Sequence, residues 1–156
     1  MQRENRRLAG IVAADIARIK GQSEMRAVQL RGDARSTRVY CSSCYSIIGI
    51  DHPGYQDNVF LIFPKHCKTT CDLDLETTAV LFLRDYPEEV APVPPEEIPV
   101  FHTFVYPQER ARFLSIPIVA NSFCPPSSPP KGQTLSQLID SLGGVEILGL
   151  DRGQAV

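Results

Sequence analysis

The chain has 156 residues, 43% of them hydrophobic and 22% charged, and 16 basic against 18 acidic side chains leave a formal charge of −2. This length fits one domain with a hydrophobic core, and the charge balance gives no reason to expect nucleic acid or a membrane as a partner. Thirteen prolines and ten glycines exclude a helical bundle, because each internal proline removes a hydrogen-bond donor and breaks the ladder that it enters.

Cysteine usage indicates the cellular compartment. The five cysteines form an odd set, and the charged first residues lead into no apolar stretch that resembles a signal peptide or a membrane-spanning helix. We therefore expect a cytoplasmic protein, cytosolic or nuclear, with reduced thiols. In that compartment a Cys-x-x-Cys motif favours metal binding or redox chemistry over a structural disulfide.

Strand-like patterns dominate the first three quarters of the chain, which predicts a mainly β fold. Residues 8–19 fit either an apolar helical stripe or a strand followed by a turn. Further strands are predicted at 25–30, 37–40, 45–50, 58–63, 77–83, 100–105 and 113–119. The last is predicted as an edge strand, because Pro117 cannot donate to a central ladder.

The carboxy-terminal part has a different pattern. Residues 124–133 are rich in proline and serine, which is typical of a linker. Thr134 then predicts the cap of a short helix, and Gly143 and Gly144 predict its end. Such a short helix must dock on the body or on a partner to be stable. The sequence thus predicts a domain over 1–123, a linker over 124–133, and a helix with a tail over 134–156.

The candidate functional motif is the Cys-x-x-Cys formed by Cys41 and Cys44, with strand-forming residues on both sides. Two thiolates at this spacing on a tight turn can hold one face of a tetrahedral Zn²⁺, as in a zinc knuckle. The flanking strands predict that the motif forms the tip of a hairpin. A structural zinc needs four ligands, so this motif is half of a site.

Three residues could complete the zinc site within the chain: His66, Cys67 and Cys71. Twenty-two residues separate Cys44 from Cys67, slightly more than in the usual zinc ribbons. The predicted metal ligands are therefore Cys41, Cys44, Cys67 and Cys71. One alternative is that Cys67 and Cys71 are ordinary loop and strand cysteines, and that Cys41 and Cys44 are relics of a lost site. The other is that a second subunit or a partner supplies the remaining ligands.

Other readings of the polar residues stay open. A redox role for Cys41 and Cys44 is disfavoured, because thioredoxin-like pairs lie between a strand and a helix, whereas residues 45–50 are strand-like. His102 is expected to be a packed strand residue and His52 an exposed loop residue. The acidic residues of 72–76 suit a solvated strand edge, and the prolines of 124–130 suit a tether more than a polyproline ligand.

Around the cysteines, residues 37–48 resemble the Arg-aromatic-Cys-x-x-Cys-Gly-x-x-aliphatic hairpin of the glutathione-dependent formaldehyde-activating enzyme and centromere protein V family. Residues 21–25 are similar to the entry to that family's preceding strand. Residues 98–105 are similar to its proline-x-x-His-x-aromatic-Val strand. The resemblance spans roughly residues 8–120.

The resemblance implies a tent-like fold of twisted antiparallel sheets, bound zinc and, in active members, carbon–sulfur lyase chemistry on adducts of an aldehyde with a glutathione-like thiol. This chain lacks the Cys-x-Cys and the Cys-x-Cys-x-x-Cys that complete the family's two zinc sites, and it has Tyr45 where a glycine is usual. We therefore expect an amino-terminally shortened relative that is non-catalytic or weakly active. The alternatives are an active lyase and an interaction module whose exposed strand edge pairs with another chain, including a second copy.

Overall fold

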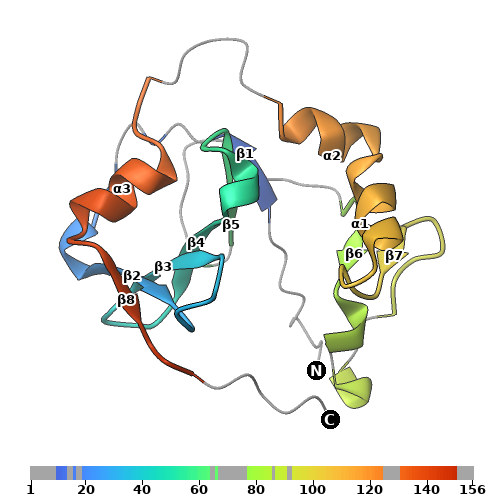
Figure 1. Cartoon of the computed structure of the whole chain (residues 1–156), viewed down its shortest axis with the longest axis horizontal. Helices are drawn as coiled ribbons and strands as arrows, with labels where there is room; N and C mark the ends of the chain where they lie inside the picture. The colour runs from blue at the N-terminus through green and yellow to red at the C-terminus, as the bar shows by residue number, and fades with distance from the viewer. Residues whose placement is uncertain are drawn as a thin grey trace.

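In the computed structural model, the described residues are 10–13, 16, 19–63, 66, 77–85, 87–90, 93–124 and 131–150. Their main feature is a six-stranded sheet with the strand order β1-β5-β4-β3-β2-β8 (Figure 1). Its strands are β1 Gly10–Ala13, β2 Met25–Gln29, β3 Thr37–Cys41, β4 Ile47–Asp51, β5 Val59–Ile62 and β8 Val145–Ile147. A separate two-stranded sheet pairs β6 Val80–Leu81 with β7 Val100–Phe101.

Three α-helices accompany the sheets: α1 Pro107–Leu114, α2 Pro117–Ser122 and α3 Leu135–Ser141. Short 3₁₀ turns lie at η1 Gln22–Glu24, η2 Pro53–Tyr55, η3 Leu83–Asp85 and η4 Glu88–Val90. In Figure 1, α3 lies beside β2 and β8, whereas α1 and α2 lie with β6 and β7 on the opposite side of the molecule. No described helix is long and apolar enough to cross a membrane.

The sheet is mixed, where an antiparallel one was expected. Neighbouring strands from β1 to β2 pair antiparallel, but β8 runs parallel to β2, with Ala27 opposite Val145. Parallel neighbours need a long crossover connection, and here the chain between β2 and β8 is long and ends with α3. The expected combination of a sheet with a short carboxy-terminal helix is confirmed, with α3 packed on the sheet and β8, from the predicted tail, added to its edge.

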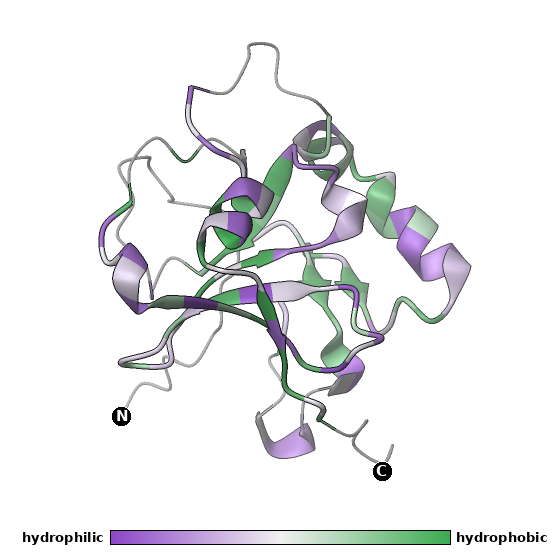
Figure 2. Cartoon of the chain, turned by 60° about the vertical axis from the view of Figure 1, so that its left-hand side comes forward, coloured by the Kyte–Doolittle hydropathy of each residue, from purple (hydrophilic) through white to green (hydrophobic). Residues whose placement is uncertain are grey.

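The main core lies between the sheet and α3. It contains buried residues of three strands, β2, β3 and β5, and of the helix: Met25, Ala27, Val39, Phe60, Ile62, Leu135, Leu138 and Ile139. Val39 is completely buried and Leu138 is 1% exposed. Hydrophobic residues, green in Figure 2, run along the strands of the sheet. Burying such side chains contributes about 1.5 to 3 kcal/mol each, so the predicted docking of the helix is both confirmed and explained.

Local signals define α3 as the sequence predicts. The Thr134 side chain accepts a hydrogen bond from the Gln137 backbone N–H, and the Gln137 side chain accepts one from the Thr134 N–H, which completes a capping box. Gly143 and Gly144 have φ angles of 92° and 100°, a region that L side chains rarely adopt, and they end the helix.

The prediction of a strand over 113–119 is wrong. These residues belong to α1 and α2, each of which has a proline, Pro107 or Pro117, at its amino-terminal end. The missing N–H of a proline carries no penalty there, because the first N–H groups of a helix have no partner within it. Phe113 and Val119 pack with Phe101 into a second core cluster.

Other predicted strands differ in extent. Of residues 77–83 only β6 forms a strand, and of residues 100–105 only β7 does so. The ambiguous segment 8–19 contains a strand, β1. Within the predicted linker, Gln133 forms an isolated antiparallel bridge with Ile16, while residues 125–130 and the acidic residues Asp72, Asp74 and Glu76 lie outside the described part.

Candidate functional site

The two cysteines of the Cys-x-x-Cys motif lie at the tip of the β3–β4 hairpin, as predicted. Cys41 is the last residue of β3, and its backbone N–H donates to the Ser46 carbonyl at 3.0 Å. The N–H of Tyr45 donates to the Cys41 carbonyl at 2.8 Å, so residues 41–45 form one helix-like turn. Side chains three residues apart on such a turn lie on the same side of the backbone, which places both sulfurs together.

The preceding 3₁₀ turn, η1, holds this turn in place. The Glu24 carbonyl accepts hydrogen bonds from the backbone N–H of Ser42 at 2.7 Å and from its hydroxyl at 2.9 Å. The Ser43 hydroxyl donates to the Glu24 carboxylate at 2.7 Å. The residues between the cysteines therefore position the turn, a role that the motif alone does not reveal.

Tyr45 adopts the conformation that a glycine normally supplies after a zinc knuckle. Its φ is 58°, in the left-handed region, where an L side chain costs roughly 1 to 2 kcal/mol. Its ring stacks on Tyr40, with ring centroids 6.4 Å apart and planes 11° from parallel. Since the Tyr45 side chain is 77% exposed, this stacking offsets the strain only weakly.

Cys44 is exposed and Cys41 is half-buried. The Cys44 Sγ lies 3.4 Å from the Ser46 Oγ. Hydrogen bonds from the Ser46 side chain and backbone, and from the Cys41 side chain, lower the pKa of the Cys44 thiol. The turn therefore stabilises a thiolate, which is the form that binds metals and attacks electrophiles.

His66, one of the candidate ligands, lies against the same hairpin. Its Nδ1 is 3.0 Å from the carbonyl oxygen of Ile47, the first residue of β4, and its ring stacks on Phe63. A carbonyl only accepts, so Nδ1 carries the proton in this bond and Nε2 keeps its lone pair. A backbone carbonyl in this position is the usual orienting partner of a metal-binding histidine.

The described residues do not by themselves complete a metal site. Among them, no three His, Cys, Asp or Glu side chains come close enough together to hold a metal ion, so His66 does not join the two sulfurs. Cys67 and Cys71, the other predicted ligands, lie outside the described residues. Cys124, at the end of α2, is a free and exposed thiol.

The other histidines differ from expectation. His102 is exposed rather than packed, and its backbone N–H donates to the Glu109 carboxylate at 2.9 Å. His52 is half-buried rather than exposed, and its Nδ1 accepts a hydrogen bond from the Gly54 N–H at 2.9 Å. Burial and the neighbouring Arg35 lower its pKa.

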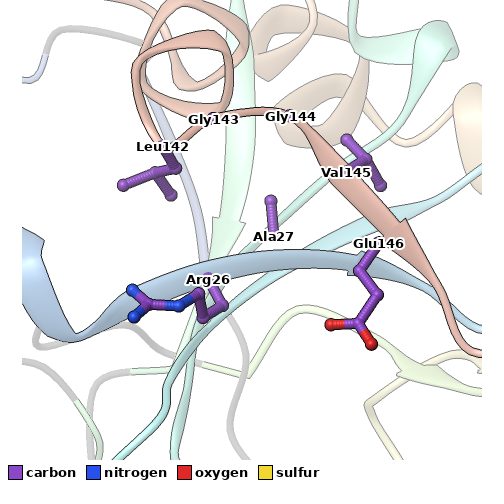
Figure 3. A pocket seen from close by; sticks show the side chains of 7 residues that line it. All are labelled: Arg26, Ala27, Leu142, Gly143, Gly144, Val145 and Glu146. Carbon is purple, nitrogen blue, oxygen red and sulfur yellow. The ribbon is translucent and has the colours of Figure 1, made fainter.

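A small pocket lies at the edge of β2, where the chain passes from α3 to β8. Its volume is about 280 Å³, and its lining residues are Arg26, Ala27, Leu142, Gly143, Gly144, Val145 and Glu146. Figure 3 shows Arg26 and Glu146 on opposite sides of Ala27, below the turn through the two glycines. Nitrogen Nη1 of Arg26 already donates to the carbonyls of Ser23 and Met25. Neither Cys41 nor Cys44 is among its lining residues.

Comparison with known proteins adds no relative. No protein-family model, curated protein or solved structure matches this chain.

Proposed function

We propose that the β3–β4 hairpin is a zinc clasp, and that the chain is a non-catalytic or weakly active relative of the glutathione-dependent formaldehyde-activating enzyme and centromere protein V family. The observation that carries the proposal is the turn of residues 41–45. It brings two sulfurs to one side, stabilises one as a thiolate and has the left-handed residue expected after a zinc knuckle. The tent-like arrangement of the sheets belongs to the same proposal.

We assign the remaining ligands to Cys67 and Cys71, in line with the sequence spacing. Support comes from His66, which hydrogen-bonds to the first residue of β4, next to the tip of the hairpin, and directly precedes Cys67 in the chain. Zinc held by four thiolates would tie this segment to the hairpin and add binding energy to folding.

Metal analysis of the full chain, purified without a chelator, tests the clasp. We expect about one zinc per chain and its loss in the Cys41→Ser/Cys44→Ser double variant. Cys124→Ser is the matched control, since it removes an exposed thiol far along the sequence from the hairpin. A wild-type content below about a tenth of an equivalent contradicts the proposal.

The Cys67→Ser/Cys71→Ser variant separates the two sources of the other ligands. Loss of zinc supports ligands from within the chain. If zinc is retained in this variant but lost in the Cys41→Ser/Cys44→Ser variant, the other two ligands are groups other than Cys67 and Cys71.

We expect weak or absent catalysis because of the cysteine motifs in the sequence. None of the five cysteines forms the Cys-x-Cys-x-x-Cys that holds the catalytic zinc in active relatives of this family. We expect the full chain to consume a glutathione–formaldehyde mixture no faster than the Cys41→Ser/Cys44→Ser variant does. A clear difference between these two rates would favour the lyase instead.

Self-association through a strand edge is a second candidate function. All three residues of β8 are exposed at the edge of the sheet, and the pairing with the β2 segment continues through the N–H groups of Leu148 and Leu150. The exposed apolar side chains along this edge are Val145, Ile147, Leu148 and Leu150. An open apolar edge of this kind can pair with the same edge of a second copy.

Light scattering coupled to size-exclusion chromatography tests this candidate. We expect a concentration-dependent dimer that Ile147→Lys converts to monomer. Val93→Lys is the control, because Val93 is exposed but does not belong to the edge. A wild-type protein that is strictly monomeric at high concentration contradicts self-association.

A further inference from the structure

We propose that Cys41 and Cys44 form a reactive dithiol that exchanges with low-molecular-weight disulfides and closes an intrachain disulfide across the β3–β4 turn. This activity goes beyond zinc binding and does not depend on it. It concerns the same two sulfurs, so an oxidised pair would no longer be available to a metal.

The first requirement, closeness of the two sulfurs, is met by the turn. The bond from the Tyr45 N–H to the Cys41 carbonyl winds the chain into one helical turn, in which side chains three apart have Cβ atoms about 5 to 6 Å apart. A disulfide needs Cβ atoms about 3.5 to 4.5 Å apart, so a small tightening of the turn is sufficient.

The second requirement is a division of roles. Cys44 is exposed, so an external disulfide can reach its sulfur, whereas Cys41 is half-buried at the end of β3. Exposure assigns the first attack to Cys44, and proximity assigns the second attack to Cys41. Thioredoxin-like pairs obtain this geometry from the first turn of a helix, which made a redox role unexpected from the sequence; here an isolated turn between two strands supplies it.

The hydrogen bonds to Glu24 add a third support. They hold the two residues between the cysteines from outside the turn, and the bonds that Cys41 contributes to the turn come from its backbone, so neither thiol is needed to maintain its shape. The turn can therefore hold the two sulfurs together in both the reduced and the oxidised state.

The chemistry balances in two exchange steps. The Cys44 sulfur attacks a disulfide RS–SR, forms a mixed disulfide and releases one thiol RSH. The Cys41 sulfur then attacks the Cys44 sulfur, which closes the Cys41–Cys44 bond and releases the second RSH. The protein loses two electrons and two protons, and the small disulfide gains both.

The test uses the full chain carrying Cys67→Ser, Cys71→Ser and Cys124→Ser, so that only the pair remains. The metal-free protein is treated with hydroxyethyl disulfide, quenched with acid and examined by intact mass and peptide mapping. We expect a protein lighter by two hydrogen atoms, with Cys41 linked to Cys44. Adding Cys41→Ser should raise the yield of the mixed disulfide on Cys44 by at least about tenfold, because nothing resolves it.

Accumulation of mixed disulfides on the two-cysteine protein without a Cys41–Cys44 bond would overturn the proposal. If the triple variant does not fold, peptide mapping of the wild-type chain gives the same decision from the same link. Zinc content of the wild-type chain, measured in parallel, separates the two proposals: zinc without the disulfide rejects only the exchange, and the disulfide without zinc rejects only the clasp.

Discussion

The hydroxyl of Ser136, in the first turn of α3, lies 3.3 Å from a carboxylate oxygen of Asp51 at the end of β4. The same hydroxyl also contacts the carboxylate of Asp57. A hydroxyl has a single proton, so it cannot donate to both carboxylates at once. The other carboxylate then faces the Ser136 hydroxyl oxygen with no proton between the two oxygens, unless that carboxylate is itself protonated. Burial, with the charge of Asp57 as a further cause, raises the pKa of Asp51 accordingly.

This arrangement predicts how stability depends on pH. The folded protein holds the Asp51 proton more tightly than the unfolded chain does. The stability that this proton contributes is fully present below the ordinary aspartate pKa of about 3.9, and it is lost as the pH rises through the raised pKa of Asp51 in the folded protein. Asp51→Asn should therefore lose less stability between about pH 4 and pH 7. At pH 7 we expect it to be more stable than the wild type by about 0.5 kcal/mol, since Asp51 is only half-buried.

Urea unfolding across this pH range measures the effect. Asp140→Asn is the control, because it removes an exposed aspartate from α3, the helix that carries Ser136. Parallel pH profiles for the wild type and Asp51→Asn would show that the Asp51 proton does not contribute.

The Ser46 hydroxyl should set the reactivity of Cys44, because its hydrogen bond is the largest of the causes that lower the pKa of this thiol. A lowered pKa keeps the thiolate populated to lower pH. In Ser46→Ala, the pH profile of Cys44 alkylation by iodoacetamide should therefore move to higher pH. Peptide mass spectrometry of chelator-treated protein measures it. Ser115→Ala is the control, because it removes a hydroxyl that bonds to the Arg112 carbonyl and not to the hairpin, and it should leave the profile in place.

The left-handed backbone of Tyr45 predicts that glycine is preferred at this position. Tyr45→Gly should be about 0.5 to 1 kcal/mol more stable than Tyr45→Ala, because alanine loses the ring but keeps the unfavourable φ. Thermal or urea unfolding of both variants measures the difference. Equal stability of the two would mean that the turn relaxes out of the left-handed region when the ring is removed.

Gly49 predicts a site that is intolerant of a side chain. A Cβ there would lie 3.3 Å from the Leu61 carbonyl oxygen and 3.3 Å from the Phe60 ring. Gly49→Ala should cost about 1 to 3 kcal/mol, because a backbone carbonyl cannot move aside without disturbing the pairing of β4 and β5. Gly32→Ala is the control, with open space around its Cβ and an expected effect within about 0.5 kcal/mol. Equal effects of the two substitutions would contradict this packing.

Predictions from the sequence succeeded where the signal was local. Alternation and turn residues identified the hairpin around Cys41 and Cys44, and the Thr134 cap with its glycine stop identified α3. They failed at residues 113–119, because Pro117 is tolerated both on an edge strand and at the start of a helix, while the neighbouring β-branched residues favour a strand. Packing of Phe113 and Val119 against Phe101 favoured the helices.

The sequence alone determined that two thiols lie on a tight turn between strands, because spacing and turn chemistry act over only a few residues. Only the tertiary structure decided what surrounds that turn. The hydrogen bond from Ser42 to Glu24 joins residues 18 positions apart in the sequence, and the contact of Ser136 with Asp51 joins residues 85 positions apart. No local pattern encodes such pairs, since they depend on how the sheet aligns its strands and where α3 docks. The parallel pairing of β8 with β2 has the same origin.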